Sequence, residues 1–354
     1  MRNGRGTDGR TTAGPSATTP PKRHAARAEP THTIAVMSDH WVEVADRVWV
    51  RRSEELDLSL GLVAGEDCCL VIDTGIDAEH GYEFATAVRE ITPLPWQIAY
   101  THHHFDHWFG TSAFGEASIW AVADGARYIG SGDVQRKMQA ATYRRRAREE
   151  AARRIGRSRL VPPNCRVAGA VGLQLGGRTV VLRQAGLAHT DNDMVVEVPD
   201  AGVLFVGDLL ERGAPPQYGD AFPYHWPQAV EYLLSWRPAT VVPGHGEPGD
   251  YWWARSQARD LAEVARLCAE VAQGTVSAEE AAEHSPFDAE TMRTALERSR
   301  VLAPPQSLQA PAPPPPAEAA PQGAGPTASP AVEAAPGAPV YIFDSIDFHD
   351  DGAE

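Results

Sequence analysis

The sequence predicts an α+β fold in which two β-sheets form the core and helices cover both outer faces. Short strand-like runs fall into two series, one before residue 101 and one between residues 179 and 206. Helix-like stretches separate and follow these runs. Because sheets and amphipathic helices must each bury an apolar face, this order favours two central sheets packed between helices.

The first series begins at residues 41–51, which alternate apolar and polar side chains as in a single strand. Two further strands are expected at residues 58–64 and 68–72, and the three together suggest a meander. Residues 78–91 have a helical pattern, and a short strand is expected at residues 96–100.

The second series repeats this organisation in the later half of the chain. Short strands are expected at residues 179–182, 194–198 and 203–206. Helices are expected at residues 227–236, 251–272 and 288–300. The two series therefore supply one sheet each.

Composition divides the chain into four regions. Residues 1–37 carry six basic residues and few bulky apolar ones, which is typical of a disordered basic arm, although Met37 is also a candidate start. Residues 38–302 form the expected catalytic domain. Residues 303–339 hold 12 of the 29 prolines and predict a disordered Pro/Ala-rich linker. Residues 340–354 form an acidic and hydrophobic tail.

Charge and apolar content exclude several classes of protein. The 354 residues include 32 Lys and Arg against 47 Asp and Glu, a net charge of −15, so we expect no nucleic-acid partner. The sequence contains neither a membrane-spanning stretch nor a signal peptide, so no membrane association is expected. Four cysteines, of which Cys68 and Cys69 are adjacent, cannot form a disulfide framework. These features predict a cytoplasmic protein.

The strongest chemical signal is the heptapeptide THHHFDH at residues 101–107, directly after a predicted strand. Where the chain is extended, the side chains of His102 and His104 project from the same face, so both can reach one metal ion. The turn that follows can direct Asp106 and His107 to a neighbouring position. Imidazole nitrogen and carboxylate oxygen suit zinc. The alternative is a histidine-rich surface turn that binds metal adventitiously.

Three more polar residues stand at the ends of apolar runs. His189 lies in AHTDN, Asp208 closes VLFVGD, and His245 lies in VVPGHGE. Each is weak alone, because a single histidine is more often a surface or hydrogen-bonded residue than a ligand. Together with residues 101–107 they form an ordered set.

In this order the chain resembles the metallo-β-lactamase fold superfamily, whose motifs are an early Asp, HxHxDH, His, Asp and His. The residue that corresponds to the early Asp is Asp73. The complete ligand set is similar to that of glyoxalase II. The resemblance spans about residues 40–270 and implies a four-layer αββα sandwich with two zinc ions at one edge of the sheets. It implies His102, His104 and His189 as ligands of the first ion, Asp106, His107 and His245 as ligands of the second, and Asp208 as the bridge. Asp73 would brace the HxHxDH turn through hydrogen bonds.

The expected activity is a zinc-dependent hydrolysis in which a metal-bridging hydroxide attacks a small ester, lactone, thioester or amide. Asp106 would accept or relay a proton as well as bind metal. One alternative is a mononuclear iron (Fe²⁺) sulfur dioxygenase on the same fold. A β-lactamase is less favoured, because Asp208 stands where the β-lactamases with similar motifs have Cys. A third reading is a binding protein whose tails carry the function.

A basic helical insert is expected at about residues 122–160. Residues 136–159 contain ten basic residues against Glu149 and Glu150. Their composition favours helix. The segment could lie over the site as a lid that recognises an anionic substrate, or it could be a solvated helix paired with acidic surface, which is the interpretation we favour.

Aromatic residues around the predicted site are candidate contacts for a small-molecule substrate. They are Trp108, Tyr218, Phe222, Tyr224, His225 and Trp226. Packing against the sheets is an equally good interpretation of each. In the tail, residues 340–348 alternate apolar and acidic side chains and could dock a partner or add a strand to a sheet edge. A disordered tail is favoured there.

Overall fold

The computed structural model describes residues 40–302 and 340–343, and all of them belong to one compact unit, Met37–Glu354. The predictions for residues 1–37, for the linker 303–339 and for most of the tail lie outside the described residues. Within the described ranges, no helix is both long enough and apolar enough to span a membrane.

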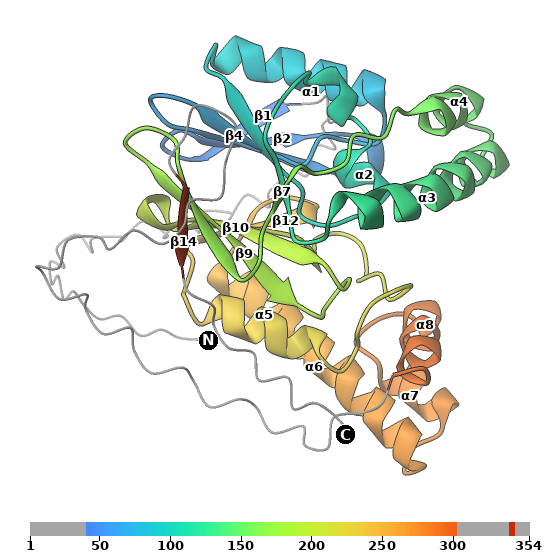
Figure 1. The fold of residues 1–354 in the computed structure, drawn as a ribbon. Coiled ribbons are helices and arrows are strands. Elements are labelled where there is room, and N and C mark those ends of the chain that lie inside the picture. Colours follow the sequence, from blue (N-terminus) through green and yellow to red (C-terminus); the bar gives the residue numbers. More distant parts are fainter. Residues whose placement is uncertain (1–39, 303–339, 344–354) are drawn as a thin grey trace, which may run out of the picture. The chain divides into compact units, whose positions relative to one another are not determined.

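The described strands form two seven-stranded sheets (Figure 1). The first sheet contains, in spatial order, β1 His40–Ala45, β2 Val48–Arg52, β3 Ser59–Ala64, β4 Cys69–Ile72, β5 Trp96–Ala99, β6 Ile119–Ala121 and β7 Cys165–Arg166. The second contains β13 Gly249–Asp250, β12 Thr240–His245, β11 Val203–Glu211, β10 Asp193–Val198, β9 Thr179–Gly186, β8 Ala170–Gln174 and β14 Val340–Phe343.

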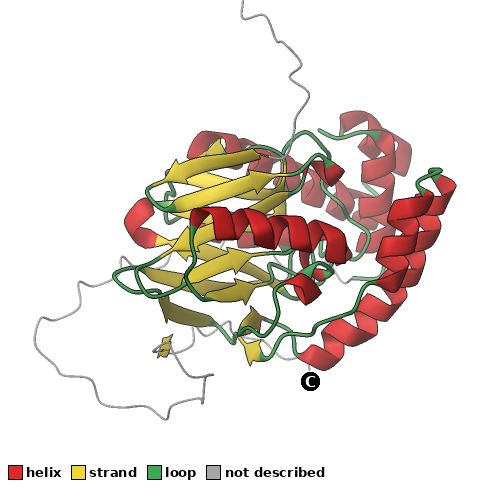
Figure 2. Ribbon diagram, turned by 90° about the horizontal axis from the view of Figure 1, so that it is seen from above, coloured by secondary structure: helices red, strands yellow, loops and turns green. Residues whose placement is uncertain are grey.

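Helices cover the outer faces of these sheets (Figure 1). Those of the first half are α1 Ala78–Ile91, α2 Phe105–Trp108, α3 Gly125–Arg145 and α4 Glu149–Arg157. Those of the second half are α5 Trp226–Leu234, α6 Tyr251–Gln273, α7 Ala278–His284 and α8 Ala289–Ser299. From above, the strands fill the centre and helices lie over them and to one side (Figure 2).

Three apolar clusters correspond to the three interfaces of a four-layer sandwich. One joins the first sheet to α1, α3 and α4, and includes Phe84, Ile98 and Tyr128. A second lies between the sheets, where Leu70 of β4 and Phe205 of β11 are buried. The third joins the second sheet to α5 and α6. The predicted α+β class and the αββα layering are therefore confirmed.

The sequence prediction joined two strands into one, did not favour β14, and missed the short elements β6, β7, β8, β13 and α7. Residues 41–51 form a hairpin, β1 and β2, because the chain turns at Asp46 and Arg47, whose φ is 54°. The strand β14 pairs antiparallel with β8, from Val340 opposite Leu173 to Phe343 opposite Ala170. Residues 340–343 therefore add a strand to the edge of the second sheet, which was the alternative to the disordered tail that composition favoured.

The order of the strands brings several carboxyl ends to one edge. The meander β1–β4 is antiparallel, as expected, whereas β4, β5 and β6 run parallel. In the second sheet β11 and β12 are also parallel. Loops that follow parallel strands emerge at the same edge of a sheet, which places the motif segments after β4, β5, β11 and β12 near one another.

Candidate metal centre

The predicted ligand residues all lie at that edge. His102 and His104 occupy the turn after β5, and Asp106 and His107 lie on the short helix α2. His189 lies in the loop between β9 and β10. Asp208 lies within β11, which continues to Glu211 rather than ending at residue 206, and His245 is the last residue of β12.

Asp73 holds the turn that carries the first four ligands. Its carboxylate accepts hydrogen bonds from the Thr101 backbone N (2.7 Å), from Thr101 Oγ1 (2.8 Å) and from His107 Nδ1 (2.8 Å). The residue itself has φ of 59°, a left-handed conformation that Asp tolerates better than most side chains. The bracing contact expected for Asp73 is thus present.

Two glycines make room for this arrangement. A Cβ on Gly207 would lie 2.8 Å from Thr101 Cβ, and its φ of +53° also favours glycine. A Cβ on Gly244 would lie 1.9 Å from Oδ1 of Asp208. Close packing of β11, β12 and the turn therefore depends on these two positions.

The predicted ligand residues form two of the three groups of described side chains that could each hold a metal ion, the third being His103, His104 and Asp220. Within each group the potential ligand atoms lie within 4.8 Å of one another. The first group is His102, His104, His189 and Asp208, and the second is Asp106, His107 and His245.

Asp208 lies between the two groups. Its Oδ2 is 3.6 Å from Nε2 of His102 and 3.6 Å from Nε2 of His189. Its Oδ1 is 3.3 Å from Nε2 of His107, and its Oδ2 is 3.4 Å from Nε2 of His245. One carboxylate is therefore close to histidines of both groups.

Several of these atoms fit a bound cation because, although they lie close to one another, they make no hydrogen bond. Among the described residues, Nε2 of His102, Nε2 of His107 and Oδ1 of Asp208 are buried without a hydrogen bond. Leaving buried polar atoms unpaired is costly, and a cation contacted by lone pairs from these atoms would satisfy them together. Nitrogen and carboxylate oxygen donors suit zinc and other transition metals.

The electrostatic surroundings differ between the two groups. Burial lowers the pKa of His102 well below its ordinary value and, with the charge of His104, lowers the pKa of His189 to about 3. These two imidazoles are neutral at pH 7. Burial opposes protonation of His107 and His245 too, but Asp208 and Asp106 raise the pKa of both well above the ordinary value. Without a metal ion, His107 and His245 therefore hold protons at positions where a cation could bind.

Two acidic residues near the cluster were missed from the sequence. Asp220, in the loop between β11 and α5, lies with Oδ1 3.1 Å and Oδ2 3.2 Å from Nε2 of His104. Glu211, at the end of β11, is buried with Oε1 unpaired, and burial together with the Asp208 charge raises its pKa to about 8. An acidic residue ending an apolar strand was a usable signal for Glu211, whereas Asp220 had none.

The basic insert forms α3 and α4, and the inner face of α3 supports the ligand turn. Gln135 Oε1 accepts from the Phe105 backbone N (2.8 Å), and Gln135 Nε2 donates to the His103 carbonyl (2.9 Å). The side chains of Arg144, Arg145 and Arg146 are exposed. Helical structure is as expected here, while the role of the exposed basic side chains stays a prediction.

Most of the aromatic substrate candidates are core residues. Trp108, Tyr218, Tyr224 and Trp226 are buried, as the packing interpretation expects, and their contact with a substrate stays a prediction. The Trp108 Nε1 donates to the His103 carbonyl (3.1 Å), and the Trp226 ring packs edge-on against His189, with centroids 5.4 Å apart. Phe222 and His225 remain partly exposed.

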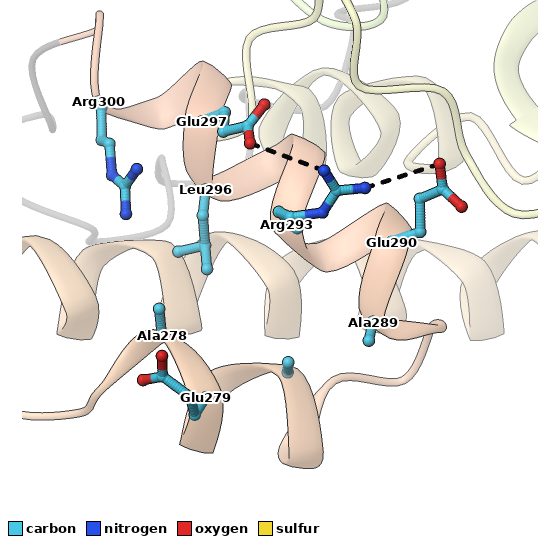
Figure 3. A pocket seen from close by; sticks show the side chains of 9 residues that line it. Ala278, Glu279, Ala289, Glu290, Arg293, Leu296, Glu297 and Arg300 are labelled. Atoms are coloured by element: carbon cyan, nitrogen blue, oxygen red, sulfur yellow. Dashed lines mark ion pairs between the residues drawn. The ribbon is translucent and has the colours of Figure 1, made fainter.

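One open groove of about 500 Å³ lies between α7 and α8, away from this cluster (Figure 3). None of the residues that line it belongs to the two ligand groups. Its central cation, Arg293, pairs with Glu290 (3.6 Å) and Glu297 (4.0 Å) of the same helix. The groove is therefore a feature of the helical hairpin and not of the metal cluster.

Comparison with known proteins agrees with this geometry. The family model described as "Metallo-beta-lactamase superfamily" matches residues 59–245, which contain the two ligand groups. A stretch of 83 residues is 32% identical to metallo-beta-lactamase type 2 of Bacillus cereus. It amounts to 22% of this chain, and the chain spans 32% of the length of that relative.

Two solved structures superpose on about two thirds of this chain. The metallo-beta-lactamase FIM-1 from Pseudomonas aeruginosa, in its mono-zinc form, superposes with a TM-score of 0.50 at 18% identity, covering 65% of this chain and 97% of that one. A metallo-beta-lactamase from Pontibacter korlensis gives a TM-score of 0.48 at 20% identity, covering 64% and 99%.

Proposed function

Because this chain belongs to the metallo-beta-lactamase superfamily, we propose that it is a zinc-dependent hydrolase acting on a small ester, lactone, thioester or amide. The observation that carries the proposal is the position of Asp208, within 3.6 Å of histidines from both ligand groups. A carboxylate so placed can serve two ions. A binuclear site is therefore favoured over a mononuclear one.

The residues divide between the two ions as follows. His102, His104 and His189 would hold the first ion, Asp106, His107 and His245 the second, and Asp208 both. At such sites, bound metal supplies activation of a water molecule at neutral pH and polarisation of the carbonyl that is attacked. Zinc is proposed because imidazole and carboxylate are its usual ligands at catalytic sites.

The chain's own residues prepare this site before any substrate arrives. Asp73 keeps a proton on Nδ1 of His107, so that Nε2 presents its lone pair to the cluster. The Trp226 ring packs against His189 and excludes water from that side. Asp106, whose Oδ2 lies 3.3 Å from Nε2 of His245, is the residue we propose to accept a proton during hydrolysis.

The first test is the metal content of untagged protein purified without added metal, measured by plasma mass spectrometry. About two zinc ions per chain are expected, with hydrolysis of at least one member of an ester, lactone, thioester and β-lactam panel. One iron per chain with oxygen consumption would replace the proposal with sulfur oxidation. No metal, and no affinity for added zinc, would overturn it.

Variants make the same test specific to the cluster. Asp208→Ala and His104→Ala are each expected to lose metal and activity, since each removes a ligand. The matched control is His284→Ala, because His284 is exposed on α7 and outside both ligand groups. Full turnover in Asp208→Ala would contradict the proposed role of that carboxylate.

A further inference from the structure

His104 differs from the other histidines of the first group in what surrounds it. Its side chain is 23% exposed, whereas those of His102 and His189 are 1% and 0% exposed. Its Nδ1 faces the cluster, 3.0 Å from Nε2 of His189. Packing therefore constrains His104 less than its neighbours, which leaves room for a contact outside the cluster to help orient its ring.

That contact is made by Asp220. Both carboxylate oxygens lie within 3.2 Å of Nε2 of His104. A carboxylate at this place requires the proton of the neutral imidazole to sit on Nε2, which leaves the lone pair on Nδ1, the nitrogen that faces the cluster. The opposite tautomer would direct an N–H group at the metal position.

Asp220 is in turn held through its backbone by the C-terminal helix α8. Arg298 Nε donates to the Ala221 carbonyl (2.6 Å), and Arg298 Nη2 donates to the Asp220 carbonyl (3.1 Å). The same guanidinium lies over the Phe222 ring, 5.3 Å from its centroid. Because guanidinium is planar and its donors are fixed in a fork, these contacts define the path of residues 220–222.

We infer that Asp220 is a positioning residue that sets the tautomer and orientation of His104, and that Arg298 holds Asp220 in place. The inference rests on the proposed metal-dependent function. If so, residues that support the metal centre lie outside residues 59–245, the segment matched by the family model, and include Arg298 on α8, which begins at Ala289. The helical hairpin of α7 and α8 thereby supports a ligand of the first ion.

The test is the zinc affinity of the metal-free full-length chain, measured in competition with a chromophoric chelator. Loss of a carboxylate partner of a ligand histidine typically weakens metal binding about 10- to 100-fold, and we expect this for Asp220→Ala. Asp220→Asn keeps a hydrogen-bond acceptor and should recover part of the affinity. Arg298→Ala should weaken binding less, by roughly three- to tenfold, because Asp220 itself remains.

Arg293→Ala is the matched control. Arg293 lies on the same helix but points into the groove between α7 and α8, where it pairs with Glu290 and Glu297 (Figure 3). Its zinc affinity should equal that of the wild type. Two further readouts separate positioning from loss of structure. The cobalt-substituted Asp220→Ala variant should have an altered visible spectrum, while its metal-free form should melt within about 4 °C of the wild type.

The outcomes distinguish this inference from the proposed function. Wild-type affinity in Asp220→Ala would overturn the role of Asp220, and wild-type affinity in Arg298→Ala would overturn that of Arg298. A wild-type chain that binds no zinc would overturn the proposed function itself, and the inference with it. Weaker binding in Asp220→Ala and Arg298→Ala, but not in Arg293→Ala, supports the inference.

Discussion

Two aspartates contact histidines of the same turn, Asp73 at His107 and Asp220 at His104 and, at 3.7 Å, His103, but their surroundings are opposite. The side chain of Asp73 is 2% exposed and accepts three hydrogen bonds, two of them from Thr101. The side chain of Asp220 is 45% exposed and contacts His104 from a loop. The contrast suggests that the buried aspartate supports both the fold and the site, whereas the exposed one supports only the site.

The largest expected effect comes from removing the buried partner. Asp73→Ala would leave the Thr101 N–H, the Thr101 hydroxyl and Nδ1 of His107 without their acceptor. Breaking a buried network of this kind costs about 3–5 kcal/mol of unfolding free energy. Asp220→Ala should cost less than about 1 kcal/mol, because an exposed pair contributes little. Denaturant unfolding of the metal-free proteins measures both, and similar losses in the two variants would contradict the comparison.

The next largest effect is expected from a substitution that displaces Thr101, which donates to Asp73, and leaves the Asp73 carboxylate unchanged. In Gly207→Ala the new Cβ would meet Thr101 at 2.8 Å and the backbone has φ of +53°, so strain adds to overpacking. In Gly213→Ala, on the loop that leads to Asp220, φ is +93° and no atom lies within 4 Å of the new Cβ. We expect Gly207→Ala to lower the unfolding free energy by about 3 kcal/mol and Gly213→Ala to lower it by about 1–2 kcal/mol. A larger loss of unfolding free energy in Gly213→Ala than in Gly207→Ala would mean that the Asp220 loop supports the fold more than the surroundings of Asp73 do.

A smaller effect concerns the support from α3. Gln135→Ala would remove the acceptor for the Phe105 backbone N and one donor to the His103 carbonyl. We expect a loss of about 1–2 kcal/mol and weaker binding of metal by both ligand groups, since the whole turn is loosened. The control is Gly130→Ala, also in α3, whose new Cβ would meet nothing within 4 Å and should be neutral or stabilising. Unfolding and zinc titration of both variants provide the measurement.

The same contrast explains what the sequence could predict. Asp73 and the HxHxDH turn follow apolar strands, and strand ends are visible in a hydrophobic pattern. Asp220 lies 116 residues from the histidine it contacts, and Arg298 lies 78 residues from Asp220. No periodicity or local motif connects residues at such distances on loops and helices. Only the folded structure pairs them.

The fold itself was predicted in class but not in every element. The two sheets and their helical layers followed from the alternation of strand-like and helix-like runs. The hairpin of β1 and β2 was hidden because its turn places Arg47 at positive φ, where glycine or asparagine would have been the usual sequence signal. The pairing of β14 with β8 was hidden because it joins segments far apart in the chain.

The smallest effect is the pH dependence of the exposed pair in the metal-free protein. Burial opposes ionisation of Asp220, but the hydrogen bond from His104 holds its pKa below the ordinary value, so its contribution is present above about pH 4 and is lost as the pH falls. Burial likewise opposes protonation of His104, but Asp220 raises the pKa of its imidazole. That contribution is present below about pH 6.5 and is lost as the pH rises through the raised value.

The difference in unfolding free energy between the wild type and Asp220→Asn should therefore be greatest between roughly pH 4 and 6.5. It should stay under about 1 kcal/mol, because Asp220 is nearly half exposed, and it should shrink in high salt. Urea unfolding at pH 5.5 and pH 9, with a chelator and at two salt concentrations, measures it. A difference that changed with neither pH nor salt would mean that Asp220 is held by packing, as Asp73 is, and that the two carboxylates are equivalent after all.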